Sequence, residues 1–160
     1  MTREEVIRAI TAGTERIERV RPQASAAPET ALGAGDWRVR DALSHLAARG
    51  DAVQLVRARL ARAAAGTATQ GAPDINAINA AQVSERAHLP VDAILDEIVA
   101  GHTAAIEEVR TLDDAYLAQT LTVGPAATEV TVAEMLVRGG VGHEATHLDE
   151  IEAALGRGAG

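Results

Sequence analysis

Apolar residues recur at every third or fourth position in four long stretches of the chain, and this pattern limits the possible folds more than any other feature. The pattern predicts helices over about residues 3–21, 38–65, 90–111 and 131–155. No stretch has the convincing alternation of a strand. Four amphipathic helices in 160 residues predict one all-α domain, a four-helix bundle over residues 1–156, with a loose tail at 157–160.

Capping signals predict several helix ends. Thr2 and Glu5 form a T-x-x-E capping box, and Thr131 and Glu134 form a second one. Pro22 begins a stretch rich in Pro, Ala and Gly, which predicts that the first helix stops there and a loop follows.

The connection between the second and third predicted helices is long, covering residues 67–89. Bundle neighbours need far fewer connecting residues, so this length permits a crossover, with a short helix at about Ile75–Arg86. Asn76 and Asn79 in this segment suit either a pocket mouth or ordinary turn chemistry. A loop with Gly124 and Pro125 precedes the fourth helix.

Charge and composition exclude several classes of protein. A formal net charge of −8 argues against binding to nucleic acid or to an anionic membrane. The absence of cysteine restricts metal ligands to His, Asp and Glu. The stretch MTREEVIRAI has no apolar core, and no apolar run approaches about 18 residues, so we expect no signal peptide and a cytoplasmic protein. We expect its partner to be a small molecule.

His143 and His147 lie four residues apart on the inner face of the last predicted helix. This spacing places both imidazoles on one face, where they can reach one divalent ion. The alternative is a pair of hydrogen-bonded core histidines.

The same residues spell His-Glu-Ala-Thr-His, a match to the zinc-protease pattern H-E-x-x-H. Only thirteen residues follow His147, and Ala153 occupies the position where a third ligand would stand. No candidate strand is available to hold a peptide substrate. The missing third ligand and the missing strand therefore argue against a peptidase.

A third metal ligand has to come from upstream, from His45, His88 or His102. His45 lies about 10 Å along the second predicted helix, and antiparallel packing would bring it to nearly the depth of the pair in the fourth. A half-exposed helix histidine is the alternative for His45. His102, on the apolar face of the third helix, is expected to be a core histidine or to orient a ligand, with a fourth-ligand role as the alternative. His88 is expected on a surface loop.

Two carboxylates accompany these histidines. Asp41, four residues before His45, suits a role in orienting the His45 ring or in complementing the helix dipole. Glu144 lies on an apolar arc, where a carboxylate is costly unless it is paired or functional. It is a candidate general base near the metal, a buried partner for Arg or His, or a subunit contact.

Three segments carry a family resemblance. "DWRVRDALSHLA" resembles the W-x-x-x-D-x-x-x-H-L stretch of the DinB-like superfamily, and "TVAEMLVRGGVGHEATHLDEI" resembles its closing H-x-x-x-H helix. The connector "DINAINAAQVSERAHLPVDAILDEIVAGH" is similar to ClbS/DfsB-type bundle proteins and to the metal-binding domain of mycothiol-dependent maleylpyruvate isomerase. The resemblance spans nearly the whole chain. It implies an up-down-down-up bundle with a divalent metal on three histidines, which here are His45, His143 and His147. Arg38 departs from the Ser or Thr cap that is common in the family.

The resemblance also implies a function. It suggests a small metal-dependent enzyme, either a thiol-dependent transferase or isomerase or a hydrolase of an electrophilic small molecule. The metal would be Zn, Ni or Fe, with mycothiol as one possible thiol, and the protein would be a homodimer. The alternatives are a non-catalytic binding protein for self-resistance or stress and a metal-stabilised structural bundle.

Three glycines interrupt the last predicted helix just before its histidines. Gly139, Gly140 and Gly142 weaken a helix, so we expect them to provide a small surface where a neighbouring helix or a ligand approaches the metal turn. Leucine at Gly139 or Gly142 is then expected to disturb metal affinity.

Overall fold

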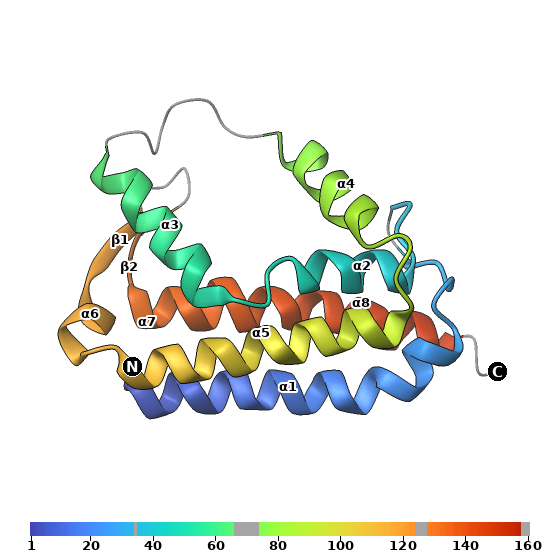
Figure 1. Ribbon diagram of the computed structural model, residues 1–160, viewed down its shortest axis with the longest axis horizontal. Helices are drawn as coiled ribbons and strands as arrows, with labels where there is room; N and C mark the ends of the chain where they lie inside the picture. Colours follow the sequence, from blue (N-terminus) through green and yellow to red (C-terminus); the bar gives the residue numbers. More distant parts are fainter. Residues whose placement is uncertain (34, 66–73, 124–127, 158–160) are drawn as a thin grey trace.

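The computed structural model describes residues 1–33, 35–65, 74–123 and 128–157 (Figure 1). It is mostly helical, which confirms the all-α prediction. The elements in chain order are α1 (Arg3–Ala26), α2 (Val39–Ala47), α3 (Ala52–Ala64), α4 (Ile75–Glu85), α5 (Val91–Thr111), α6 (Asp114–Ala118), β1 (Thr120–Val123), β2 (Thr128–Thr131), α7 (Val132–Met135), a π-helix η1 (Leu136–Val141) and α8 (Gly142–Arg157). Within the described residues, no helix combines the length and apolar character needed to cross a bilayer.

The long helices lie side by side in Figure 1. α1 and the continuous α7–η1–α8 rod run in one direction, and α2 and α5 run in the opposite direction. α5 packs against α1 and α2, and α8 also packs against these two helices. α2 and α8 are therefore antiparallel, as the depth argument for His45 required.

The predicted end of the first helix near residue 21 is wrong. α1 continues to Ala26, with Pro22 inside it. Pro22 removes one helical hydrogen bond, but the turn that follows it buries Ala24 completely in the core. Tertiary packing of this turn outweighs the local signal of the proline.

The predicted helix over 38–65 is two helices, α2 and α3, separated at residues 48–51. Gly50 and Gly101 explain the break, because a Cβ on Gly101 would lie 2.8 Å from the backbone carbon of Gly50. The backbones of α5 and of this connection touch there. Asp51 then caps α3 by accepting a hydrogen bond from the backbone N–H of Gln54 at 3.0 Å.

The last predicted helix contains the π-helix η1 between α7 and α8. π-helical turns are rare and often lie at functional sites, and this one ends directly before the helix that carries His143. Gly140 of η1 faces another helix, since a Cβ there would lie 3.0 Å from Cβ of Ala52 in α3. A Cβ on Gly139 would meet Met135 of its own rod, and one on Gly142 only the carbonyl oxygen of Val137 at 3.5 Å. Gly140 alone of the three thus fits the expected role of letting another helix approach.

A short antiparallel hairpin corrects the expectation that the chain has no strand. β1 pairs with β2, with Leu121 opposite Val130 and both side chains buried. Strands of four residues are too short to give a clear alternation in the sequence. The expected loop residues Gly124 and Pro125 lie outside the described residues.

Other predicted boundaries agree with the structure. Both capping boxes are present, at Thr2 and at Thr131. The short helix expected at about Ile75–Arg86 is α4, and the helix expected over 90–111 is α5, which Pro90 precedes as its cap. Arg157 ends α8, and the rest of the expected tail, 158–160, lies outside the described residues.

A polar layer divides the core into two apolar clusters. One cluster holds Ile17 of α1 and Ile98 of α5, and the other holds Ile10 and Ala105 of the same two helices. The layer between them consists of Thr14, His102 and Glu144, which we call the central polar layer. Together, α1, α5 and α8 each contribute one residue to it.

Candidate metal centre

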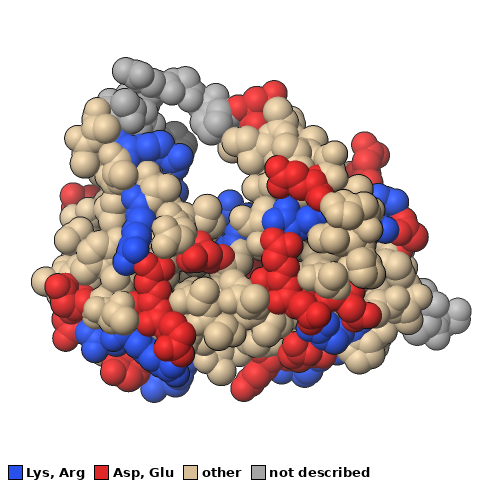
Figure 2. Space-filling model, in the orientation of Figure 1, with Lys and Arg blue, Asp and Glu red and all other residues tan. Residues whose placement is uncertain are grey.

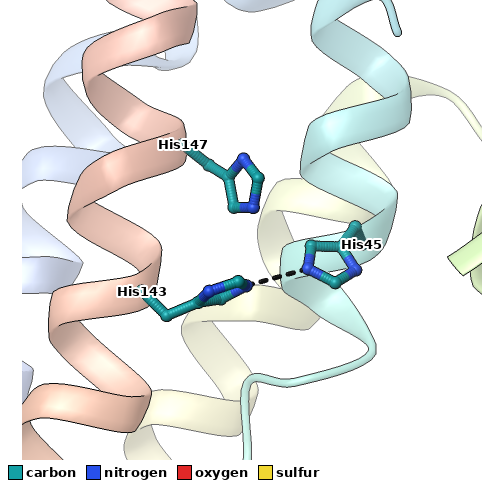
Figure 3. A group of neighbouring side chains, drawn as sticks. All are labelled: His45, His143 and His147. Atoms are coloured by element: carbon teal, nitrogen blue, oxygen red, sulfur yellow. Dashed lines mark hydrogen bonds between the residues drawn. The ribbon is translucent and has the colours of Figure 1, made fainter. Parts of the chain in front are cut away.

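Three histidines from two antiparallel helices converge at one side of the bundle. His45 comes from α2, and His143 and His147 come from adjacent turns of α8 (Figure 3). A ring nitrogen from each of them lies within 4.8 Å of one from each of the others. Nε2 of His45 is 2.9 Å from Nε2 of His143. The structure therefore brings together the three residues that the sequence singled out.

Burial differs among the three rings. His45 is buried, with 4% of its surface exposed, whereas His143 and His147 are partly exposed. Trp37 covers this group, with its ring centroid 5.2 Å from that of His45 and 5.8 Å from that of His147. The histidine cluster is thus held against the protein on one side and remains accessible on the other.

Oxygen acceptors fix the tautomers of two rings. Nδ1 of His45 donates to Oε1 of Gln82 at 2.8 Å, and Nδ1 of His147 donates to Oε2 of Glu150 at 3.0 Å. A protonated Nδ1 leaves the lone pair of a neutral imidazole on Nε2, and such hydrogen bonds orient histidine ligands of metals. Both rings are therefore prepared to bind through Nε2.

Asp41 does not orient His45, which corrects one of the two alternatives for that residue. Its carboxylate accepts hydrogen bonds from the backbone N–H and the guanidinium of Arg38 instead. Arg38 therefore precedes α2 without a side-chain cap of the Ser or Thr kind, and Asp41 in the first turn accepts the Arg38 backbone N–H instead.

Burial and neighbouring charge keep two of the rings neutral. Burial, together with the positive charge of Arg49, lowers the pKa of His143 to about 4. Burial is also the main cause that lowers the pKa of His45. Neutral imidazole is the form that binds metal, so neither ring has to lose a proton at neutral pH.

Glu144 and His102 pair in the central polar layer. Oε2 of Glu144 and Nε2 of His102 are joined by a hydrogen bond of 2.8 Å, and both residues are buried. The Thr14 hydroxyl forms a hydrogen bond of 3.0 Å with Nδ1 of His102 and also lies 3.2 Å from the carbonyl oxygen of Ile10. This arrangement agrees with one of the expected roles of Glu144, as the buried partner of a histidine. His102 is a satisfied core histidine and lies outside the three-histidine group.

A small cavity adjoins both the central polar layer and the histidine cluster. It has a volume of about 20 Å³ and is lined by His102, Glu144, His143 and Arg49, among others. This volume holds about one water molecule. The cavity, which we call the inner cavity, brings Glu144 and His143 to one shared space.

The remaining candidates lie at the surface. His88 is exposed in a turn after α4, as expected, and Asn76 is also exposed. Asp74 caps α4 by accepting hydrogen bonds from the backbone N–H groups of Asn76 and Ala77, so Asn76 lies in the first turn of this helix.

The donor set fits a divalent transition metal. Ligand nitrogens at about 2.0–2.1 Å from one ion lie about 3–4 Å from one another, which is close to the spacing of this cluster. Imidazole suits Zn²⁺, Ni²⁺ and Fe²⁺ alike. Three ligands leave a coordination position for water or another small molecule.

Comparison with known protein families shows to which family the chain belongs. The family described as mycothiol maleylpyruvate isomerase N-terminal domain matches residues 8–145. The chain belongs to this DinB-like family. The family match includes His45 and His143 and stops two residues before His147. No curated protein and no solved structure matches the chain.

Sequence reasoning missed Gln82 and Glu150 as partners of the candidate ligands. Glu150 stands three residues after His147, a spacing at which helical side chains meet, so its contact had a local signal. Gln82 had none, because the orientation of α4 against α2 depends on tertiary packing.

Proposed function

We propose that this protein is a divalent-metal enzyme whose ion is held by His45, His143 and His147. The observation that carries the proposal is the convergence of three imidazole nitrogens, with two Nδ1 atoms already engaged by oxygen. A bound divalent ion would lower the pKa of a coordinated water or thiol and so supply a nucleophile at neutral pH.

The reaction class follows from the family and from this chemistry. We infer a thiol-dependent transferase or isomerase, with mycothiol as a candidate thiol, or a hydrolase, acting on an electrophilic small molecule. The family description names mycothiol and maleylpyruvate isomerase, and this supports the thiol-dependent class over hydrolysis.

The side chains around the cluster have separate tasks in this proposal. Gln82 and Glu150 orient two rings, and Trp37 covers them on one side. Glu144 is the candidate proton acceptor, because it lines the inner cavity together with His143. His102 holds the Glu144 carboxylate in place through their hydrogen bond.

Three wider expectations belong to the proposal. We infer the up-down-down-up topology of the family, which the directions of α1, α2, α5 and α8 in Figure 1 support. We also propose a cytoplasmic location and a homodimer, and light scattering during gel filtration tests the latter.

Metal analysis tests the central point. We expect one divalent ion per chain in protein purified with added Zn²⁺ or Ni²⁺ and measured by mass spectrometry of the metal. Alanine at His143 or His147 should reduce affinity by more than the roughly 10–100-fold caused by loss of an outer hydrogen-bond partner. His88→Ala is the matched control, since His88 is an exposed histidine away from the cluster. Substoichiometric metal in the wild type, or equal affinity in all of these variants, contradicts the proposal.

A further inference from the structure

A second pocket lies beside the inner cavity, between α3 and the α7–η1 segment. It has a volume of about 130 Å³, large enough for several waters or a small organic anion. Its lining includes Arg49, Arg59 and Arg62, together with apolar groups such as Leu55 and Met135. We call it the arginine pocket. Figure 2 shows basic side chains along α3, at the edge of the hollow between α3 and α4.

The charge of this pocket contrasts with that of the whole chain. The protein carries a formal net charge of −8, yet no acidic side chain among the described residues lines the arginine pocket. Elsewhere on α3, Arg57 pairs with Glu108, whereas no ion pair joins Arg59 to a described residue. Arg59 therefore presents to the pocket a positive charge that no ion pair with a described residue offsets.

Arg49 connects the arginine pocket with the metal centre. It lines both the pocket and the inner cavity, where His143 lies. Its guanidinium donates to the carbonyl oxygen of Gly139 at 3.4 Å, and burial lowers its pKa. Burying the Arg49 guanidinium away from water without a carboxylate partner costs free energy. An incoming anion would therefore be bound favourably here.

We propose that the arginine pocket binds a carboxylate of the reacting molecule through Arg49 and Arg59 and so positions that molecule beside His143. A guanidinium presents paired N–H donors that match the two oxygens of a carboxylate, which favours this anion class. The positioning role rests on the proposed metal function, while anion binding itself does not require the metal. The carboxylate belongs either to an electrophilic substrate or to a thiol cosubstrate.

Calorimetric titration of the metal-free protein with succinate tests the pocket. We expect binding by the wild type, at least about tenfold weaker binding by Arg59→Gln and Arg49→Gln, and no binding of uncharged succinamide. Arg57→Gln is the matched control, because Arg57 lies on the same helix but outside the pocket lining. Circular dichroism confirms that each variant is folded, and Arg59→Gln decides the result if Arg49→Gln is not.

Equal succinate affinity in the wild type and Arg59→Gln overturns the proposal, as does equal affinity for succinate and succinamide. Absence of succinate binding to the wild type also overturns it. If the wild type binds no divalent metal but still binds succinate in a way that depends on Arg59, only the proposed metal function is contradicted. The two proposals therefore fail separately.

Cobalt-loaded protein distinguishes the two sources of the carboxylate. Thiolate coordination produces a sulfur-to-cobalt absorption band, and we compare 3-mercaptopropionate with 2-mercaptoethanol. A band at lower concentration for 3-mercaptopropionate, with the difference lost in Arg59→Gln, assigns the pocket to the thiol cosubstrate. Equal bands, with succinate still bound in the presence of 2-mercaptoethanol, assign it to the electrophilic substrate. Both results support the pocket.

Discussion

Gln82 of α4 accepts a hydrogen bond from Nδ1 of His45 in α2 at 2.8 Å, which links the connector helix to a candidate metal ligand. α4 contributes no buried residue to the core and yet reaches the site through this side chain. The long connector therefore has a direct role at the candidate metal centre.

Replacing Gln82 should weaken metal binding. Gln82→Ala removes the acceptor that fixes the His45 tautomer, and the expected loss of Zn²⁺ affinity is about 10–100-fold. Competition with a chromophoric chelator measures this loss. Ser84→Ala, an exposed change on the same helix, should leave the affinity unchanged. Equal affinity in the two variants would show that this hydrogen bond does not support the ligand.

The stability of the metal-free protein should depend on pH through His143. Burial holds its pKa at about 4 in the folded protein, below the ordinary value of 6.5. The unfolded chain therefore binds a proton first as pH falls, so the stabilisation is present above about pH 6.5 and is lost toward pH 4. The difference in unfolding free energy between wild type and His143→Gln, measured with urea, should shrink over this window. His88→Gln should show no such change, and a constant difference for His143→Gln would exclude this linkage.

Alanine at Gly13 should disturb the central polar layer. A Cβ there would lie 2.7 Å from Oε1 of Glu144, so the carboxylate has to shift and its bond to His102 is strained. We expect this strain to cost about 1–3 kcal/mol in unfolding free energy, which exceeds or at least offsets the gain of up to about 1 kcal/mol from alanine in a helix. Gly156→Ala is the control, since nothing lies within 4 Å of its Cβ position, and it should be neutral or stabilising. If thermal unfolding shows that Gly13→Ala is as stable as Gly156→Ala, Glu144 moves aside without cost.

The glycines before the metal turn should respond differently to substitution. Gly142→Ala meets only a carbonyl oxygen at 3.5 Å, so it should stabilise α8 by up to about 1 kcal/mol and leave metal affinity unchanged. Gly140→Leu should push α3 from η1 and destabilise the protein by about 1–3 kcal/mol. Denaturation and metal titration of both variants measure these effects. A reversed order of stability would contradict the close approach at Gly140.

Periodicity predicted the helices and the inward faces of α2 and α8 because these depend on local spacing. The same spacing, with antiparallel packing assumed, placed His45 beside His143, and the structure agrees. Pro22 misled the prediction of the first helix because the burial of Ala24 is a tertiary effect.

The sequence pattern could not predict contacts between segments that lie far apart in the sequence. The approach of Gly101 to Gly50 explains the break between α2 and α3, and it depends on where α5 lies. The partner of Asp41 is Arg38 and not His45, since the Arg38 guanidinium reaches forward along the first turn of α2. The π-helical turn in η1 likewise depends on how the rod packs against α3 and α1.

The central polar layer fixes the axial register of α1, α5 and α8 relative to one another. A shift of α8 by one turn, about 5.4 Å, would carry Glu144 away from His102 and leave both groups buried without partners. Apolar contacts alone tolerate such shifts far better, because one aliphatic side chain can replace another. The same shift would move His143 away from His45, so the Glu144–His102 bond also fixes the register of the histidine cluster on the same helix.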